Sequence, residues 1–579
     1  GIPESQLTDD LAYGYNRSLL SFYHIDPIFF PSRSNSTTPG NIRNDRNQLS
    51  DHYVREVFEK EVFPFKESVT GLPMTLPTFD LAYYPNVRGP YNFTTTGVNP
   101  DGTLSNPRSR WGGIFRRLES NDFEALNIEF IEFWMLDPFI YKPNSTGGDL
   151  YFNLGNISED ILKDGRKSLE NGLPSDSDPS KFDVTSWGRV PKLQPVIQAF
   201  DNNPDVRRLQ DVGLDGLGDE NERSGFADFI ARARTVLSPA ALAELERDPA
   251  SDNFVYYRGT QLDQAGAGIL KRYQRYNGTE GNSKTPQQSL EETGVENSAA
   301  TSLPDGEDIN RDNNSTRADE YFQYKVSIRP QDLAAVGRNY ITDIVPATVK
   351  LPNGKSETVR WIQFKVPVSD IQARVGGIQD FKSIRFIRMF TTDFADTTIM
   401  RFARLQLVRG EWRRFNAENS PSGVIADPAL TNAGPDNSTL EVTTVNIEEN
   451  GKRSPIPYVV PPGIERERDF SNFRGDTRQN EQSLALNVRS LRDGYGRAAF
   501  RNTFSDFRSY RRIEMFIHAE GEELRDRDVS AFLRIGTDNQ DNYYEFEVPL
   551  KVTNPGSRNP FAIWPDENKM DIEVRLFQE

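Results

Sequence analysis

Four acidic residues between positions 211 and 222 have the spacing of a metal-binding loop. Asp211, Asp215, Asp219 and Glu222 stand at positions 1, 5, 9 and 12 of a twelve-residue stretch, and Gly216 stands at position 6. Helix–loop–helix calcium sites place oxygen ligands at such positions and need glycine at position 6 for a sharp turn. We therefore interpret the four carboxylates as candidate calcium ligands.

The stretch departs from that pattern at two glycines. Gly213 stands at position 3, where it offers no side-chain oxygen, and Gly218 stands at position 8 in place of an apolar residue. An acidic loop surrounded by solvent is the alternative interpretation. A phosphate-binding glycine loop is rejected, because the neighbouring Asp211, Asp215 and Asp219 would repel a phosphate group.

No set of residues in the sequence predicts catalysis. The chain has three histidines, His24, His52 and His518, and it has no cysteine, which excludes thiol catalysis and zinc–thiolate sites. Glu129 and Glu132 lie three apart in a predicted strand and therefore face opposite sides of it, so they cannot form an acid–base pair by themselves. We expect that the protein is not an enzyme.

A repeated pattern predicts the elements that hold these residues in place. An apolar residue, a charge, a bulky residue, isoleucine, a charge and two large apolar residues occur at 128–134 and at 384–390, and more weakly at 510–516. Apolar bulk on both faces favours a strand that is covered on each side, and Asp137-Pro138 ends the first copy. A buried helical turn is the alternative. Three copies more than a hundred residues apart predict three similar domains.

We expect a mainly β fold with several jelly-roll-like β-sandwich domains in tandem and a mostly helical insertion in the first. Many short strands separated by Gly and Pro turns favour sandwiches, and Ser238-Pro239 is typical of a helix start. The predicted divisions are an irregular, aromatic-anchored segment at 1–70, a first sandwich at 71–275 with its insertion at 193–275, a linker at 276–318, a second sandwich at 319–416, a linker at 417–438 and a third sandwich at 439–579.

Composition limits the classes of partner. The 579 residues carry a formal net charge of −17 at pH 7, which repels the phosphates of nucleic acids and anionic lipid headgroups. The sequence has no run of about 18 apolar residues that would predict a membrane helix. No signal peptide begins at Gly1, so we expect a mature product or an excised piece. Strands with one polar face leave open the alternative that part of the chain forms outer-membrane barrel strands.

Short motifs along the whole chain resemble those of one protein family. They are Asn-Arg-Ser at 16–18, Ile-Asp-Pro at 25–27, Glu-Val-Phe-Pro at 61–64, Tyr-Tyr-Pro at 83–85, Arg-Gly-Pro-Tyr-Asn at 88–92, Arg-Trp-Gly-Gly-Ile at 110–114, Ile-Glu-Phe-Trp-Met-Leu-Asp-Pro-Phe at 131–139, Asp-Val-Gly-Leu-Asp-Gly-Leu at 211–217, Glu-Gly-Asn-Ser at 280–283, Asn-Tyr-Tyr-Glu at 542–545 and Ile-Trp-Pro at 563–565. The chain resembles the SprA (Sov) family, very large outer-membrane proteins of gliding motility and type IX secretion in Bacteroidota.

The resemblance implies a role in protein export. Members of the family form the translocon, a giant β-barrel through which folded effectors reach the cell surface, and this shorter chain would be a soluble cap or insert. Its implied partners are the rest of the barrel, accessory translocon proteins and the effectors in transit. We expect it at the outer membrane, on the extracellular face, with the periplasmic face as the alternative. The family supplies no catalytic residues.

A carbohydrate-binding or glycan-processing β-sandwich remains an alternative function. Aromatic residues make up 11% of the chain, and acidic loops accompany them. Such a protein needs exposed aromatic rings in a cleft, so the alternative depends on whether Trp111, Trp134, Trp187 and Trp361 are exposed.

Overall fold

The computed structural model describes residues 3–66, 73–176, 178–293, 301, 303–415, 424–426, 437–467, 478–503, 509–538 and 542–577. The chain divides into two compact units. The first comprises Gly1–Val57 and Leu76–Arg409, and the second comprises Phe58–Thr75 and Gly410–Glu579. Within the described residues, no helix combines the length and the apolar character needed to cross a membrane.

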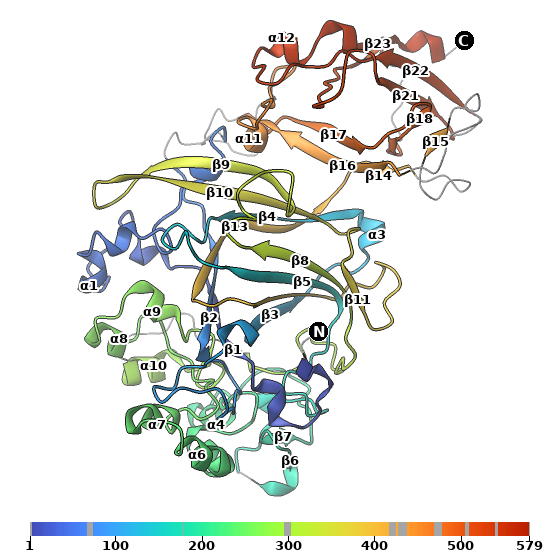
Figure 1. The fold of residues 1–579 in the computed structure, drawn as a ribbon. Helices are drawn as coiled ribbons and strands as arrows, with labels where there is room; N and C mark the ends of the chain where they lie inside the picture. Colours follow the sequence, from blue (N-terminus) through green and yellow to red (C-terminus); the bar gives the residue numbers. More distant parts are fainter. Residues whose placement is uncertain are drawn as a thin grey trace. The chain divides into compact units, whose positions relative to one another are not determined.

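Two antiparallel sheets form the centre of the first unit (Figure 1). The six-stranded sheet has the order β1 (Ser18–Tyr23), β2 (Phe79–Arg88), β13 (Thr398–Arg409), β4 (Ile128–Leu136), β10 (Ser356–Pro367) and β9 (Ile341–Lys350). The five-stranded sheet has the order β11 (Ala373–Val375), β8 (Glu320–Ile328), β5 (Gly148–Asn156), β12 (Phe386–Thr392) and β3 (Trp111–Arg117). Every neighbouring pair in both sheets is antiparallel.

The largest hydrophobic core lies between these sheets. Phe133 of β4 stacks on Phe364 of β10, with ring centroids 4.6 Å apart, and lies 5.5 Å from Phe152 of β5 in the other sheet. All three side chains are fully buried. Burying such a side chain contributes about 2 kcal/mol to folding, so this shared core holds the two sheets together as a sandwich.

The structure confirms the mainly β class and shows all three copies of the repeated pattern as strands, in β4, β12 and β20 (Arg512–Met515). It differs from the expected division into domains, because β4 and β12 lie in the two sheets of one sandwich. Strands from 71–192 and from 319–416 therefore share both sheets and do not form separate domains. Pairing between strands more than two hundred residues apart leaves no local signal in the sequence.

The third copy of the pattern lies in a different setting. β20 pairs only with β23 (Met570–Glu573) among the described strands, and Arg512 is exposed where the earlier copies have Phe130 and Phe386. A charged residue at that position cannot be buried cheaply, so one face of β20 stays in contact with solvent.

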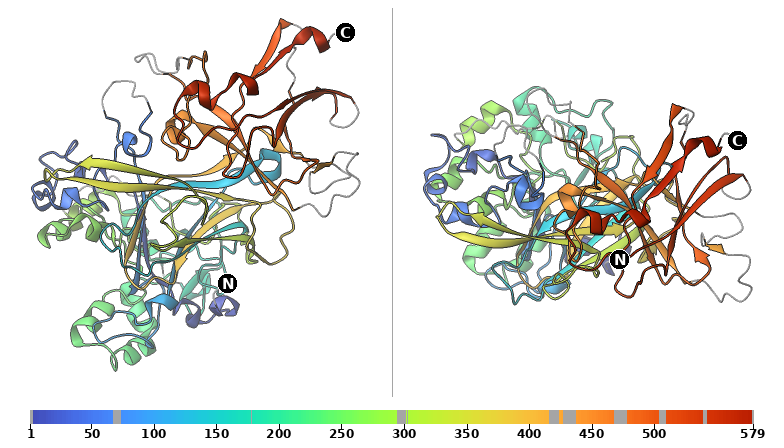
Figure 2. Two further views of the ribbon diagram at one scale, coloured as in Figure 1. Left: turned by 45° about the horizontal axis from the view of Figure 1, so that its top comes forward. Right: turned by 90° about the horizontal axis from the view of Figure 1, so that it is seen from above.

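The N-terminal segment contributes an edge strand, β1, and an aromatic anchor. The ring of Tyr23 stacks on Tyr273 at 4.4 Å, and Phe29 lies edge-on to Tyr257 and Tyr273. These residues form a second hydrophobic core over the outer side of β1 and β2, where Figure 2 shows the blue N-terminal segment beside the green helices. Two short helices in this part of the chain are α1 (Gly40–Arg43) and α2 (Glu59–Val62).

The expected helical insertion is confirmed. Its helices are α4 (Pro204–Gln210), α5 (Asp219–Gly225), α6 (Ala227–Ala233), α7 (Pro239–Leu245), α8 (Thr260–Gln264) and α9 (Ile269–Tyr273). Ser238 caps α7, since its hydroxyl accepts a hydrogen bond from the Ala241 N–H. Helices α6 and α7 pack on Phe93 and Trp187 in a third core, in which the Phe93 and Phe226 rings lie 4.2 Å apart.

The expected linker at 276–318 belongs to the first unit, and parts of its described residues are buried in it. It contains α10 (Pro286–Thr293), and the side chains of Ser283 and Glu307 are fully buried. The remaining elements of the first unit are α3 (Phe123–Leu126), β6 (Phe182–Val184) and β7 (Arg189–Pro191). Among the described residues, the 3-10 helices are Pro3–Gln6, Leu11–Gly14, Pro27–Phe29, Gln48–Ser50, Pro107–Ser109, Glu170–Gly172, Pro179–Lys181, Asp566–Asn568 and Val574–Phe577.

The second unit is built from pairs of antiparallel strands in its described residues. The pairs are β14 (Arg413–Arg414) with β19 (Ala499–Phe500), β15 (Ile425–Ala426) with β18 (Tyr495–Gly496), β16 (Thr439–Asn446) with β17 (Gln482–Arg489), β20 with β23, and β21 (Ser530–Gly536) with β22 (Tyr543–Pro549). Its helices are α11 (Ile447–Asn450) and α12 (Pro560–Ile563). Tyr458 and Trp564 anchor its small core. Most of the expected linker at 417–438 lies outside the described residues.

Candidate metal centre

The acidic stretch connects α4 to α5 at the end of the sandwich where β2 leaves its sheet. Two glycines shape the loop: Gly213 has φ +77° and Gly216 has φ +69°, a conformation that favours glycine. A Cβ on Gly216 would lie 2.3 Å from the Arg189 carbonyl oxygen, so the close approach of the two chains also requires glycine. The tyrosine that follows β2, Tyr91, accepts a hydrogen bond from the Leu214 N–H and fixes the middle of the loop.

Three buried carboxylates converge at this loop. Asp215, Glu222 and Asp252 are 2%, 0% and 1% exposed, and one oxygen from each lies within 4.8 Å of the others. Each carboxylate accepts a hydrogen bond through one oxygen. The donors are the Leu217 N–H to Asp215 Oδ1 at 2.9 Å, the Ala250 N–H to Glu222 Oε2 at 2.9 Å, and the Tyr91 hydroxyl to Asp252 Oδ2 at 2.8 Å.

The second oxygen of each carboxylate has no hydrogen-bond partner in the described part of the chain. These atoms are Asp215 Oδ2, Glu222 Oε1 and Asp252 Oδ1, and all three are buried. A buried carboxylate oxygen without a donor costs several kcal/mol unless the group is protonated or a cation lies beside it. The arrangement has the donor set of a hard-cation site.

The electrostatic environment of the three carboxylates also favours a bound cation. Burial, with a further contribution from the charge of Asp252, raises the pKa of Asp215 well above its usual value. Burial and then the charges of Asp215 and Asp252 likewise raise the pKa of Glu222. Burial and the charge of Asp248 raise the pKa of Asp252. Three carboxylates that each resist ionisation lower their energy when a cation neutralises them.

The structure brings some of the sequence-predicted ligands together and separates others. Asp215 and Glu222 meet in the buried group. Asp219 lies beside it and forms an adjoining group with Glu222 and Asp248, one oxygen of each again within 4.8 Å. Asp211 lies apart, because its carboxylate accepts hydrogen bonds from the N–H groups of Gly281 and Ser283 at 3.0 and 3.1 Å.

Sequence spacing could not identify Asp252. It lies 30 residues beyond Glu222 and follows α7, so only the fold brings it to the loop. The adjoining group differs from the buried one, since Asp248 already lies 3.6 Å from the Arg275 guanidinium and accepts the Asp252 N–H at 3.0 Å. The Arg275 guanidinium therefore already supplies a positive charge to the adjoining group.

In a third acidic group, backbone donors satisfy all but one of the carboxylate oxygens, and only Asp164 Oδ2 is buried without a partner among the described residues. Asp160, Asp164 and Glu307 also converge within 4.8 Å. Glu307 Oε1 accepts the N–H groups of Ile161 and Leu162, and its Oε2 accepts that of Ser168. Backbone donors therefore occupy both oxygens of Glu307, so this group leaves one oxygen unpartnered where the Asp215, Glu222 and Asp252 group leaves three.

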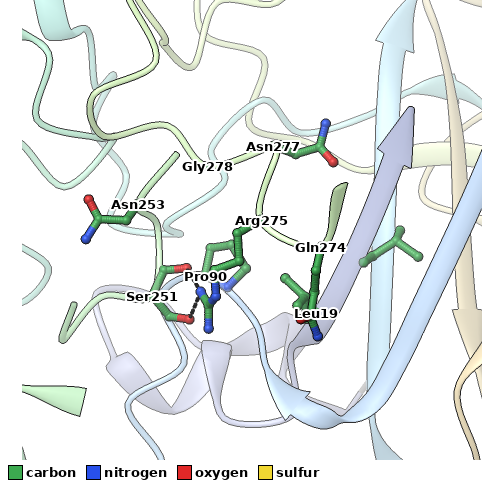
Figure 3. Close-up of a pocket in the computed structure, with 9 residues that line it drawn as sticks. Leu19, Pro90, Ser251, Asn253, Gln274, Arg275, Asn277 and Gly278 are labelled. Carbon is green, nitrogen blue, oxygen red and sulfur yellow. Dashed lines mark hydrogen bonds between the residues drawn. The ribbon is translucent and has the colours of Figure 1, made fainter. Parts of the chain in front are cut away.

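A small cavity lies near this region. A cavity of about 20 Å³ lies between β1 and the 251–278 segment, lined by Leu19, Ser251 and Arg275 among others (Figure 3). Arg275 closes one side of it by donating to the Ser251 hydroxyl at 2.8 Å. A cavity of this size holds roughly one water molecule.

The histidines occupy structural positions. His52 is fully buried, with Nε2 2.9 Å from Glu357 Oε2 and Nδ1 accepting from Arg55 Nε. His24 Nδ1 lies 2.7 Å from the Thr78 carbonyl oxygen, and His518 Nδ1 lies 3.0 Å from that of Ile563. Each ring is therefore used in packing and hydrogen bonding.

Most of the tryptophans that a carbohydrate site would need are inaccessible. Trp134, Trp187 and Trp361 are fully buried. Trp111 is partly buried, and the Arg17 guanidinium lies 5.4 Å from its ring centroid. Three of the four rings cannot stack on a sugar.

Comparison with known proteins identifies the family. The N-terminal domain of SprA, described as a motility related/secretion protein, matches residues 228–579, which is more than half of the chain. No curated protein matches the chain. The match covers α6 to α10, the sandwich strands from β8 onward and the whole of the 410–579 segment. The chain belongs to the SprA family of motility and secretion proteins.

Proposed function

We propose that this chain is a non-catalytic structural region of a type IX secretion translocon in the outer membrane, which supports protein export to the cell surface and gliding motility. Membership of the SprA family carries the proposal. Its partners are the rest of the translocon barrel, accessory translocon proteins and effectors in transit. It lies on the extracellular face of the outer membrane.

Open sheet faces in the second unit support an assembly role. Leu484, Leu486 and Val488 alternate along β17 and are all more than a third exposed. Tyr544 and Phe546 on β22 are similarly exposed. Rows of apolar side chains on solvent-facing strands are typical of surfaces that pack against another protein. Here the partner is another part of the same secretion apparatus.

Substitution on β17 tests this proposal. We expect Leu484→Lys together with Leu486→Lys, made in the full-length protein of a gliding bacterium, to reduce effector delivery to the cell surface and to slow gliding. A charge on each apolar side chain opposes its burial against a partner by several kcal/mol. Secreted effector and gliding speed are measured in cells with equal amounts of the protein.

A matched control lies on the opposite face of the same strand. Asn487 is exposed, and Asn487→Lys introduces one lysine, against two in the double variant, without touching the apolar row. The control should secrete normally. Normal secretion and gliding in the double variant would contradict the assembly role, and thermal unfolding of the isolated chain verifies that both variants fold.

A further inference from the structure

We propose that Asp215, Glu222 and Asp252 bind one calcium ion, and that this ion fastens the helical insertion to the sandwich. The site does not depend on the secretion function proposed above. Asp211 is not a ligand in this assignment, and Asp252 takes a role that no local pattern in the sequence indicates.

The geometry of the oxygens fits a calcium ion. Calcium binds oxygen at about 2.3–2.6 Å, so oxygens on opposite sides of one ion are about 4.6–5.2 Å apart. One oxygen from each of the three carboxylates lies within 4.8 Å of the others. This spacing allows a single ion between them to contact all three after a small adjustment of the side chains.

The unpartnered oxygens are the independent sign of a ligand. Asp215 Oδ2, Glu222 Oε1 and Asp252 Oδ1 are buried and accept no hydrogen bond from the described residues, although the other oxygen of each group does. The fold thus uses one oxygen per carboxylate for positioning and leaves the other free for coordination. Glu307, whose two oxygens both accept backbone N–H groups, lacks this feature, and in its acidic group only Asp164 Oδ2 is unpartnered among the described residues.

The donor atoms select a hard cation. All are carboxylate oxygens, the chain has no cysteine, and each of its three histidines contacts a different part of the structure. Zinc and copper prefer nitrogen and sulfur donors. Magnesium requires a regular octahedron and keeps several waters, whereas calcium accepts irregular, carboxylate-rich cages.

The ion would link the stretch that holds Asp215 and Glu222 to Asp252, which lies 30 residues further along the chain. Asp215 lies in the loop after α4, Glu222 lies on α5, and Asp252 follows α7. Tyr91 connects them to the sandwich, because it follows β2, donates to Asp252 and accepts from the Leu214 N–H. Loss of the ion would loosen the insertion while leaving the core between the two sheets intact.

Calcium titration of the chelator-treated chain tests the site. We expect one Ca²⁺ to bind per chain by calorimetry with CaCl₂, and Glu222→Gln or Asp252→Asn to weaken binding by about 100-fold or more. Glu220→Gln removes an exposed carboxylate from the same helix and should bind as the wild type does. Binding of no calcium by the wild type, or equal affinity in the Glu222→Gln and Asp252→Asn variants, would overturn the proposal, as would equal affinity for Mg²⁺.

Thermal unfolding separates ion loss from misfolding. In chelator, Asp252→Asn should melt at a higher temperature than the wild type, because it removes repulsion among three buried carboxylates. In CaCl₂ the order should reverse, since only the wild type gains the binding free energy. A lower melting temperature for Asp252→Asn under both conditions would contradict a calcium role and would identify Asp252 as a purely structural residue.

Discussion

At the scale of single residues, buried polar groups define the chemistry of this protein. The sequence predicts Asp215 and Glu222 as ligands because a local spacing reveals them. It cannot predict Asp252, which only the fold places beside them. The same limit applies to His52, whose contact with Glu357 spans more than three hundred residues. Local patterns identify candidate groups, and tertiary structure decides which of them meet.

His52 makes stability depend on pH. Burial lowers the pKa of His52 below its usual 6.5, and the nearby Arg55 guanidinium also lowers it, against the opposing effect of Glu357. Nδ1 accepts a hydrogen bond from Arg55, so protonation of that nitrogen would break the bond. The unfolded chain therefore binds a proton at a higher pH than the folded chain, and the contribution of His52 is present above pH 6.5 and lost as pH falls.

We expect the free energy of unfolding to fall between pH 7.5 and pH 5.5 less steeply in His52→Gln than in the wild type. The difference in slope is at most about 1.4 kcal/mol per pH unit, because a single proton is involved. Urea unfolding at several pH values measures it. Identical slopes for His52→Gln and the wild type would refute this account.

At the scale of elements, the strength of a pattern decides how well the sequence predicts it. The strand at 128–134 and the helix starting at Ser238 are predicted correctly, since apolar bulk on two faces and a capping Ser-Pro pair are local signals. The edge strand β1 is not predicted, because a single apolar face within an aromatic segment resembles irregular chain. Strand order is also missed, since β4 pairs with β10 and β13 across long intervals.

Phe133 tests the central role assigned to β4. Its ring lies at the meeting point of the two sheets, in contact with aromatic rings of β5, β10 and β13. Phe133→Ala should lower the free energy of unfolding by about 3–5 kcal/mol, the usual cost of deleting a buried aromatic ring. Denaturant unfolding gives the value, and Phe22→Ala, at a ring 38% exposed, should cost much less. Similar costs for the two substitutions would show that β4 is not the centre of the core.

At the scale of the whole molecule, one sandwich with a helical insertion accompanies a second unit of paired strands. The family could be recognised from long motifs spread along the chain, and the family match confirms it for residues 228–579. The expected three tandem domains could not be corrected from the sequence, because strands at 128–136 and 386–392 carry the same pattern although they belong to opposite sheets. A shared strand pattern reports burial on two faces, and it does not report which sheet the strand joins.

The measurement that tests the proposed function most directly is site-specific photo-crosslinking in living cells. A photoreactive residue at position 486 of the full-length protein, on the apolar face of β17, should crosslink to another component of the secretion apparatus. The same residue at position 487, on the opposite face, should crosslink much less. Absence of any crosslink to that apparatus from position 486, in cells that secrete normally, would contradict a structural role for this chain in the translocon.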